Sequence, residues 1–343
     1  MKMSKYIVKR FLYSILVLLG LSIIIFVISR IVPGDPARMA LGPRAPEYAV
    51  DNLRAEMHLD EPLYMQYVLW LGDALKGDFG QSLITRRAVA EDIVEFLPAT
   101  MEIVIISALI VIFVGINLGI LSARYSNRWF DGIIRVFSYL GIVTPAFVWA
   151  IIFILIFGYT LPIFPTIGRL SSEVIAPQTI TGMYMIDGLI TGNFAAAGDA
   201  FMHIFLPALA LSMGPAAQAA RITRSSMTEN EKKDYIVSAR AFGIPQKFIM
   251  KHQLLKPSLI PTVSVMALDI ASLIGNAFLV ELLFNFPGLS RYGVTAMLNK
   301  DLPAISAVVL VLGIFYILAN IVIDIIVSFL DPRIRSLGGA QNA

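Results

Sequence analysis

Six apolar stretches suit most of this chain to a lipid bilayer, because a spanning helix needs about 20 predominantly apolar residues. They cover residues 11–29, 103–123, 136–158, 204–220, 257–283 and 304–330. The fourth is short and holds Pro207, Gly214 and Pro215, so we expect its helix to be kinked. Charged residues make up only 15% of the chain, against about 25% in soluble proteins. The sequence predicts an all-α integral membrane protein with six transmembrane helices.

The distribution of Lys and Arg among the connecting segments predicts the orientation, because cytoplasmic loops retain positive charge. With the N-terminus inside, seventeen of the 27 Lys and Arg residues fall on the cytoplasmic side, eight of them in the segment 221–256. The long segment 30–97 falls outside, where eleven acidic residues outnumber seven basic ones. We therefore expect a multi-pass protein of the cell membrane with both termini in the cytoplasm.

The segment between the first two apolar stretches is too long for a simple connection. Pro46 is placed to open a helix that runs to Met57, and Pro62 a second helix that runs to Leu75. A turn is expected at 77–80, and an outer hairpin and loop at 158–200. The predicted organisation is 1–31 for the cytoplasmic N-terminus and first spanning helix, 32–97 for an extracytoplasmic cap, 98–331 for a core of five spanning helices with the cytoplasmic loop 221–256, and 332–343 for a cytoplasmic tail.

A polar, basic segment with strong helix signals interrupts the apolar pattern after residue 233. Asp234 is a natural helix N-cap. Tyr235, Ala239 and Phe242 recur at helical spacing on one face, and the small Ala241 adjoins it, so this face is expected to let another protein approach closely. Gly243 suits a left-handed helix end, and Pro245 suits the first turn of a following helix. The segment therefore predicts a helix, a sharp turn and a second helix.

Several motifs along the chain carry a resemblance to a known family. They are VPGDPA (32–37), GDFGQSL (77–83), LPATMEI (97–103), DYIVSARAFGIP (234–245), HIFLPALAL (203–211), LLFNFPGLSR (282–291) and DPRIR (331–335). In these motifs and their order the chain resembles permease subunits of ABC importers, in the dipeptide, oligopeptide and nickel subfamily of binding-protein-dependent transporters. The resemblance implies the type I importer permease fold.

The resemblance also implies how the subunit is powered. The cytoplasmic loop of such permeases docks on their ATPase, and here the docking helix corresponds to Tyr235–Phe242, centred on Ala239, Arg240 and Gly243. The acid and first alanine of the family signature fall on Val237 and Ser238, so a salt bridge from that acid is not expected. Implied partners are a second homologous permease, two ATPase subunits that bind the ATP and magnesium, and an extracytoplasmic substrate-binding protein.

The resemblance favours dipeptides or oligopeptides as cargo, and the same family also carries nickel chelates, glutathione and oligosaccharides. Two other classes of function remain open at this point. An ion-coupled secondary transporter would also cross the membrane many times, although such carriers usually show repeated halves, which this chain lacks. A non-transport scaffold would use the basic loop to recruit a cytoplasmic partner.

Polar residues inside the apolar stretches are candidates for a translocation pathway, because a charge facing lipid is costly. Asp269 lies near the middle of the fifth stretch, and Asn276 lies about two helical turns later on the same predicted face. Asp269 is either a pathway carboxylate that meets a cationic substrate group or a buried partner for a neighbouring helix. Glu281 and Glu102 lie near outer helix ends, where we expect them to reach water; Glu281 is also retained as a pathway candidate.

The sequence offers no sign of catalysis, of a metal site or of nucleic-acid binding. Phosphate-binding Walker loops are absent, so ATP hydrolysis is assigned to other subunits. Cysteine is absent, and His58, His203 and His252 are too dispersed to form one metal site. Basic residues on the inner side are explained by orientation and by anionic lipid. We expect no cofactor in this chain.

Overall fold

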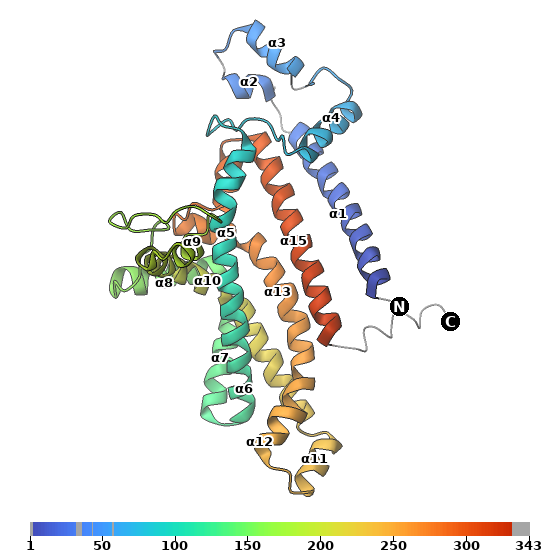
Figure 1. Ribbon diagram of the computed structural model, residues 1–343, viewed down its shortest axis with the longest axis vertical. Helices are drawn as coiled ribbons and strands as arrows, with labels where there is room; N and C mark the ends of the chain where they lie inside the picture. Colours follow the sequence, from blue (N-terminus) through green and yellow to red (C-terminus); the bar gives the residue numbers. More distant parts are fainter. Residues whose placement is uncertain (1–2, 32–35, 43, 57, 331–343) are drawn as a thin grey trace.

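The computed structural model describes residues 3–31, 36–42, 44–56 and 58–330, and these residues form helices joined by loops (Figure 1). The only strand-like pairing among them is an isolated antiparallel bridge between Gln81 and Ala88. The long helices are α1 (Met3–Ile31), α5 (Val89–Ile110), α10 (Phe194–Asn230), α13 (Leu255–Leu283) and α15 (Leu302–Leu330). The predicted tail 332–343 and most of the VPGDPA motif lie outside the described residues.

Five helical segments of the described chain are long and apolar enough to cross a membrane. A sixth candidate is a bent pair, α7 (Trp129–Val143) and α8 (Ala146–Phe153), which continues through η2 (Ile154–Thr160). The bend is 113°. Thr144 is extended there, with φ −85° and ψ 122°, because the residue before a proline is disfavoured in the helical region. Pro145 therefore breaks the third apolar stretch, which the sequence predicted as one helix.

The fourth apolar stretch forms the centre of the fold. α10 is longer than expected: it starts at Phe194, where the side chain of Asn193 accepts the N–H of Ala196 at 3.1 Å, and it continues through Pro207 and Pro215. It packs against α5, α6 (Ile116–Arg124), α7, α8, α9 (Tyr184–Thr191) and α13. α1 packs at the periphery, against α15 and α4 (Leu63–Leu75).

Small residues let α6 approach α10 closely. α6 continues α5 through the π-helical segment η1 (Val111–Gly115). A Cβ added to Gly119 would lie 2.5 Å from the Cβ of Thr223, and one added to Gly115 would lie 2.9 Å from Ala216 O. Small residues at such crossings are the usual means of close helix packing in membranes. The backbones of the second and fourth apolar segments thus lie nearly in contact.

The predicted cap region contains three short helices at one end of the molecule (Figure 1). They are α2 (Pro36–Leu41), α3 (Glu47–Glu56) and α4, and the last two begin directly after Pro46 and Pro62, as the sequence predicted. α4 contacts α1 through Tyr67, whose hydroxyl lies 2.8 Å from Ser22 Oγ. The expected boundary at 97/98 falls inside α5, because this helix starts at Val89 and includes Pro98.

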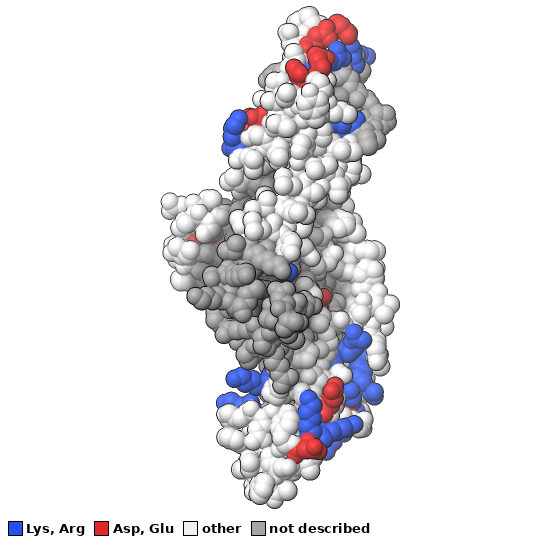
Figure 2. Space-filling model, turned by 90° about the vertical axis from the view of Figure 1, so that its right-hand side faces the viewer, with Lys and Arg blue, Asp and Glu red and all other residues white. Residues whose placement is uncertain are grey.

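Charged side chains gather towards the upper and lower ends of the face shown in Figure 2. The lower end carries the basic residues of the segment 221–256, around α11 (Asp234–Ala241) and α12 (Gln246–Phe248). The apolar helices run between these two ends (Figure 1). This distribution fits a multi-pass membrane protein, since a charge in the hydrocarbon region is disfavoured.

Candidate functional site

A helical hairpin, residues 234–254, connects α10 to α13 at the end of the molecule opposite the cap (Figure 1). α11 ends at Ala241, and Gly243, just after its C-cap residue Phe242, has a left-handed φ of +75°. Pro245 precedes α12, which continues through η3 (Ile249–Leu254) into α13. The predicted order of helix, turn and helix is confirmed. Its start is shifted by one residue: Lys233 is the N-cap and Asp234 is the first helical residue, so Asp234 stabilises the helix dipole and does not cap it.

One face of the hairpin packs against the rest of the chain. Ile236, Ala239 and Ile249 form a buried cluster with Met227 of α10 and Ala123 of α6. Ala239 is only 5% exposed. The prediction that Ala239 shares an outward face with Tyr235 and Phe242 is therefore wrong. The apolar side chains of Ile236 and Ala239 are three residues apart and face α10, so they form the inner face of α11.

The opposite face of the hairpin leaves large apolar side chains uncovered. Phe242 is 86% exposed, Val237 53%, Phe248 49% and Tyr235 45%. The smaller residues of this surface are exposed as well: Asp234, Ser238, Ala241, Gly243 and Pro245. We call this set, together with the four large residues, the hairpin surface. It stands at a charged end of the molecule where no apolar helix of the described chain covers it.

Polar contacts fix the hairpin to the two helices that carry it. Arg240 forms an ion pair with Glu231, just after α10, and donates to Gln246 of α12 at 3.2 Å. Asn230 Nδ2 donates to Ser258 Oγ at 2.9 Å, which joins the ends of α10 and α13. The first contact links the hairpin to the end of α10, and the second joins α10 to α13 beside it.

The two pathway candidates on α13 lie on its less covered side. Asp269 is half-buried, its Oδ2 is buried, and this atom has no hydrogen-bond partner among the described residues. Asn276 is exposed, as is its neighbour Gly275. The seven-residue spacing puts both side chains on one face of the helix. The Asp269 carboxylate therefore has no hydrogen-bond partner among the described residues. A structural role inside this chain would require such a partner.

Glu281 does not belong with these two residues. It is 0% exposed, and its carboxylate accepts the Thr100 hydroxyl at 2.5 Å and the N–H of Arg291 at 2.8 Å. Arg291 lies in the first turn of α14 (Leu289–Leu298), so Glu281 caps this helix. The expectation that Glu281 reaches water or lines the pathway is therefore wrong. The chain turns back after α13, and this turn encloses Glu281, the last acidic residue of α13.

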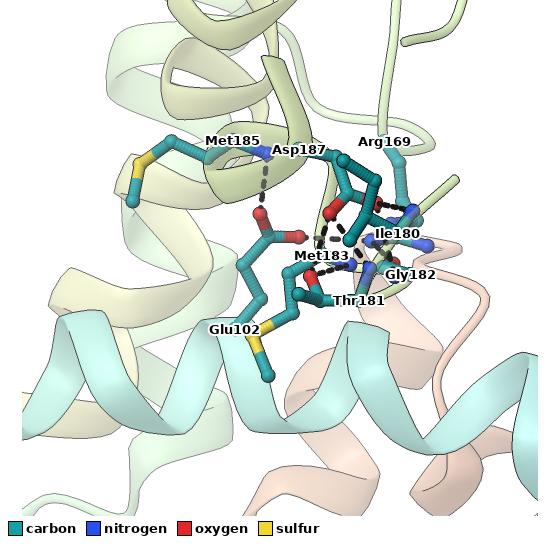
Figure 3. Close-up of polar contacts among 8 residues, drawn as sticks. All are labelled: Glu102, Arg169, Ile180, Thr181, Gly182, Met183, Met185 and Asp187. Carbon is teal, nitrogen blue, oxygen red and sulfur yellow. Dashed lines mark hydrogen bonds and ion pairs between the residues drawn. The ribbon is translucent and has the colours of Figure 1, made fainter. Parts of the chain in front are cut away.

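Glu102 is also buried, contrary to expectation. Its Oε2 accepts a hydrogen bond from Arg169 Nη2 at 2.9 Å, and its Oε1 accepts the N–H of Met185 at 2.6 Å (Figure 3). Arg169 also donates to Gly182 O at 2.8 Å and lies over the ring of Tyr184. This ion pair ties the irregular segment between η2 and α9 to α5. Glu102 could be singled out from the sequence as an acid near a helix end. No sequence feature near it identified Arg169, 67 residues away, as its partner.

Asp187 organises the end of the same segment (Figure 3). Its carboxylate accepts the backbone N–H groups of Ile180, Thr181 and Gly182 and the hydroxyl of Thr181. Burial acts to raise the pKa of Asp187, but these hydrogen bonds outweigh it and hold the pKa below the usual range. Asp187 therefore stays ionised and keeps the loop folded onto α9.

A fourth buried carboxylate, which was not predicted from the sequence, lies near the hairpin end. Asp131 of α7 accepts Arg224 Nε at 2.5 Å and Arg224 Nη2 at 2.7 Å, together with the hydroxyl of Ser122 at 2.6 Å. A two-point arginine–carboxylate pair is strong and directional. It fixes α7 to α10 close to the hairpin. The sequence signal available for Asp131 was its position directly after the aromatic pair Trp129 and Phe130 at the start of a helix.

Comparison with known proteins identifies the family. Residues 115–336 match the family described as "Binding-protein-dependent transport system inner membrane component", and residues 3–104 match its N-terminal region. The probable D,D-dipeptide transport system permease protein DdpB of Escherichia coli K12 is 39% identical over 325 residues, which are 95% of this chain and 96% of that protein.

Two further relatives match over nearly their whole length. The dipeptide transport system permease protein DppB of Alkalihalophilus pseudofirmus is 36% identical over 97% of this chain and 100% of that protein. The glutathione transport system permease protein GsiC of Escherichia coli K12 is 32% identical over 97% of this chain and 99% of that protein. With both parts of the family matched across an all-helical fold rich in membrane-spanning segments, this chain belongs to the inner membrane components of binding-protein-dependent transport systems.

Proposed function

We propose that this chain is a permease subunit of an ATP-driven ABC importer whose cargo is dipeptides and short oligopeptides. The observation that carries the proposal is the hairpin surface: a helix pair between α10 and α13 with Tyr235 and Phe242 uncovered, in a chain that belongs to this transport family. The cargo follows from the two relatives of highest identity named above, which are dipeptide permeases.

The orientation and assembly form part of the same proposal. The hairpin faces the cytoplasm with both termini, the bent pair α7–α8 is the third of six spans, and α2 to α4 form the extracytoplasmic cap. The positive charge of the segment 221–256 supports this orientation. Two ATPase subunits bind the ATP and magnesium, a second homologous permease completes the pathway, and a binding protein delivers the cargo from outside.

The hairpin serves as the mechanical coupling element. A partner shifts an equilibrium between two conformations only through contacts that differ between them. The uncovered Phe242 and Tyr235 offer such contacts to an ATPase, and the Arg240–Glu231 and Asn230–Ser258 links carry displacement into α10 and α13. Movement of these two helices changes the access of the pathway.

The pathway runs along the face of α13 that carries Asp269 and Asn276. An unpartnered carboxylate at that depth is unfavourable against lipid, so it faces water or the second permease subunit. In this position Asp269 attracts the amino group of a peptide, and Asn276 offers a neutral hydrogen-bonding group.

Uptake in the host tests the proposal. Cells that lack this chain should lose uptake of labelled alanyl-alanine, and re-expression should restore it. Uptake should stop when ATP is depleted but persist when a protonophore collapses the ion gradients at a maintained ATP level. Persistence in the deletion strain, with other peptide transporters removed, contradicts the cargo. Abolition by the protonophore at full ATP supports an ion-coupled carrier instead.

A further inference from the structure

A groove of about 460 Å³ opens between α7 and α10 near the hairpin end. Its lining includes Arg135 and Ser138 of α7, Arg221, Arg224 and Ser225 of α10, and Pro261 of α13. Helical spacing explains why α10 offers these side chains. Thr223 and Met227 face inward and are buried, whereas Arg221 and Ser225, one turn apart, are exposed. The lining of the groove is therefore basic and rich in hydroxyl groups, although α10 itself is mostly apolar.

The three arginines of the groove differ in how far their charge is compensated. Arg224 is occupied by its two-point pair with Asp131. Arg135 lies 3.8 Å from the same carboxylate, which already has other donors. Arg221 donates at 2.8 Å to the neutral amide oxygen of Gln218, and no carboxylate among the described residues pairs with it. Arg221 is the guanidinium with donors left for an anionic group.

Glu229, the acidic residue of the lining, does not compensate Arg221. It follows Arg221 by eight residues, or roughly 12 Å along the helix axis. Arg221 is exposed and begins the basic segment 221–256, so its guanidinium faces water or a ligand. The groove provides that space.

Asp269 lies on α13, farther from the hairpin than Pro261 of the groove lining. The hydroxyls of Thr223 and Thr262 are 3.0 Å apart, which sets the level at which the antiparallel α10 and α13 meet. Counted from this pair, Asp269 lies about five residues beyond the level of Arg221, or roughly 7 Å along the axis. Two extended peptide residues span about 7 Å. The axial spacing of the two opposite charges therefore matches the length of a dipeptide.

We propose that Arg221 is a specificity-determining residue that binds the free C-terminal carboxylate of the cargo while Asp269 holds its amino group. This inference rests on the proposed function and adds the substrate class: zwitterionic peptides with an unblocked C-terminus. A guanidinium suits this role because it presents several donors in a plane that matches a carboxylate. Gln218, one turn before Arg221, orients it.

The complete transporter in proteoliposomes tests the inference. Uptake of alanyl-alanine is compared with uptake of its C-terminal amide, with one wild-type binding protein throughout, so that any selectivity of the binding protein is common to all variants. Arg221→Gln should lower the ratio of kcat/KM for the free acid to that for the amide by about tenfold, the value of one charge-assisted hydrogen bond. Arg128→Gln, at the exposed turn before α7, removes an equal charge outside the groove and should leave the ratio unchanged.

A second variant keeps the inference testable if Arg221→Gln does not assemble. Ser225→Asp adds a negative charge to the groove while Arg221 stays in place, and it should also lower the acid-to-amide ratio. An unchanged ratio in an assembled, importing Arg221→Gln or Ser225→Asp transporter overturns the inference alone. Equal effects of Arg128→Gln and Arg221→Gln overturn it as well. If the wild-type transporter imports neither peptide with ATP, the proposed function fails and the inference fails with it.

Discussion

The hydroxyl of Thr100 donates a 2.5 Å hydrogen bond to Glu281, a residue 181 positions later in the chain. The same hydroxyl accepts the N–H of Leu289 at 2.8 Å. α5, α13 and the start of α14 therefore meet at one buried carboxylate, and a single side chain decides how the chain turns back after its fifth apolar segment.

Removal of this carboxylate should destabilise the protein. Glu281→Ala leaves Thr100 and the N–H of Arg291 without an acceptor, and we expect the free energy of unfolding to fall by about 3 kcal/mol. Asn276→Ala, on the exposed side of the same helix, should change it by less than about 0.5 kcal/mol. Denaturation in detergent measures both. A stable Glu281→Ala protein with impaired transport would instead restore Glu281 to the pathway.

The ion pair between Glu102 and Arg169 should contribute far more than a surface pair. Arg169→Met leaves Glu102 buried without its cation, which should cost about 3–5 kcal/mol of unfolding free energy. Lys76→Met breaks the exposed pair with Asp73 and should cost under about 1 kcal/mol. Similar shifts of the melting temperature for the two variants would contradict a buried role for Arg169.

The two faces of α11 should respond differently to substitution. Phe242→Ala removes an exposed side chain, so it should preserve the melting temperature while abolishing the stimulation of ATP hydrolysis by the loaded binding protein. Ala239→Trp forces a large ring into the cluster with Ile236 and Met227, and it should lower the melting temperature. Full coupling in the Phe242→Ala transporter would show that the hairpin surface is not the docking surface.

The contact between α6 and α10 can be tested at Gly119, which lies in it, with Gly132 of α7 as a control outside it. Gly119→Ala places a Cβ 2.5 Å from Thr223, and we expect a loss of about 1–3 kcal/mol of unfolding free energy. Gly132→Ala meets open space in α7 and should stabilise the helix by up to about 1 kcal/mol. Equal effects on denaturation would exclude a close approach of the two helices at Gly119.

The loop held by Asp187 should be insensitive to pH through the neutral range. Because its pKa is depressed, Asp187 contributes stability above the ordinary aspartate pKa of about 3.9, and this contribution is lost only as the pH falls through the lower folded value. Amide exchange of 180–184, corrected for intrinsic rates, should therefore be constant between pH 5 and 8. Asp187→Asn should raise it at every pH. Loss of protection in the wild-type loop between pH 5 and 7 would contradict this.

The sequence was sufficient for the features that arise from local physics. Apolar length predicted where spanning helices lie, since twenty residues of low polarity have few alternatives to a bilayer. Gly243 and Pro245 predicted the turn of the hairpin, because each restricts the backbone on its own. Pro46 and Pro62 predicted the starts of α3 and α4 for the same reason.

Only the tertiary structure decided which side chains face inward and which acids are paired. Glu102 and Glu281 lie near helix ends in the sequence and were expected to reach water, yet each is enclosed by partners far along the chain. Ala239 fits a surface stripe by spacing alone, but the placement of α10 and η3 buries it. Helical periodicity fixes which residues share a face, whereas the packing of other helices determines which face is covered, and that information lies in contacts between distant residues.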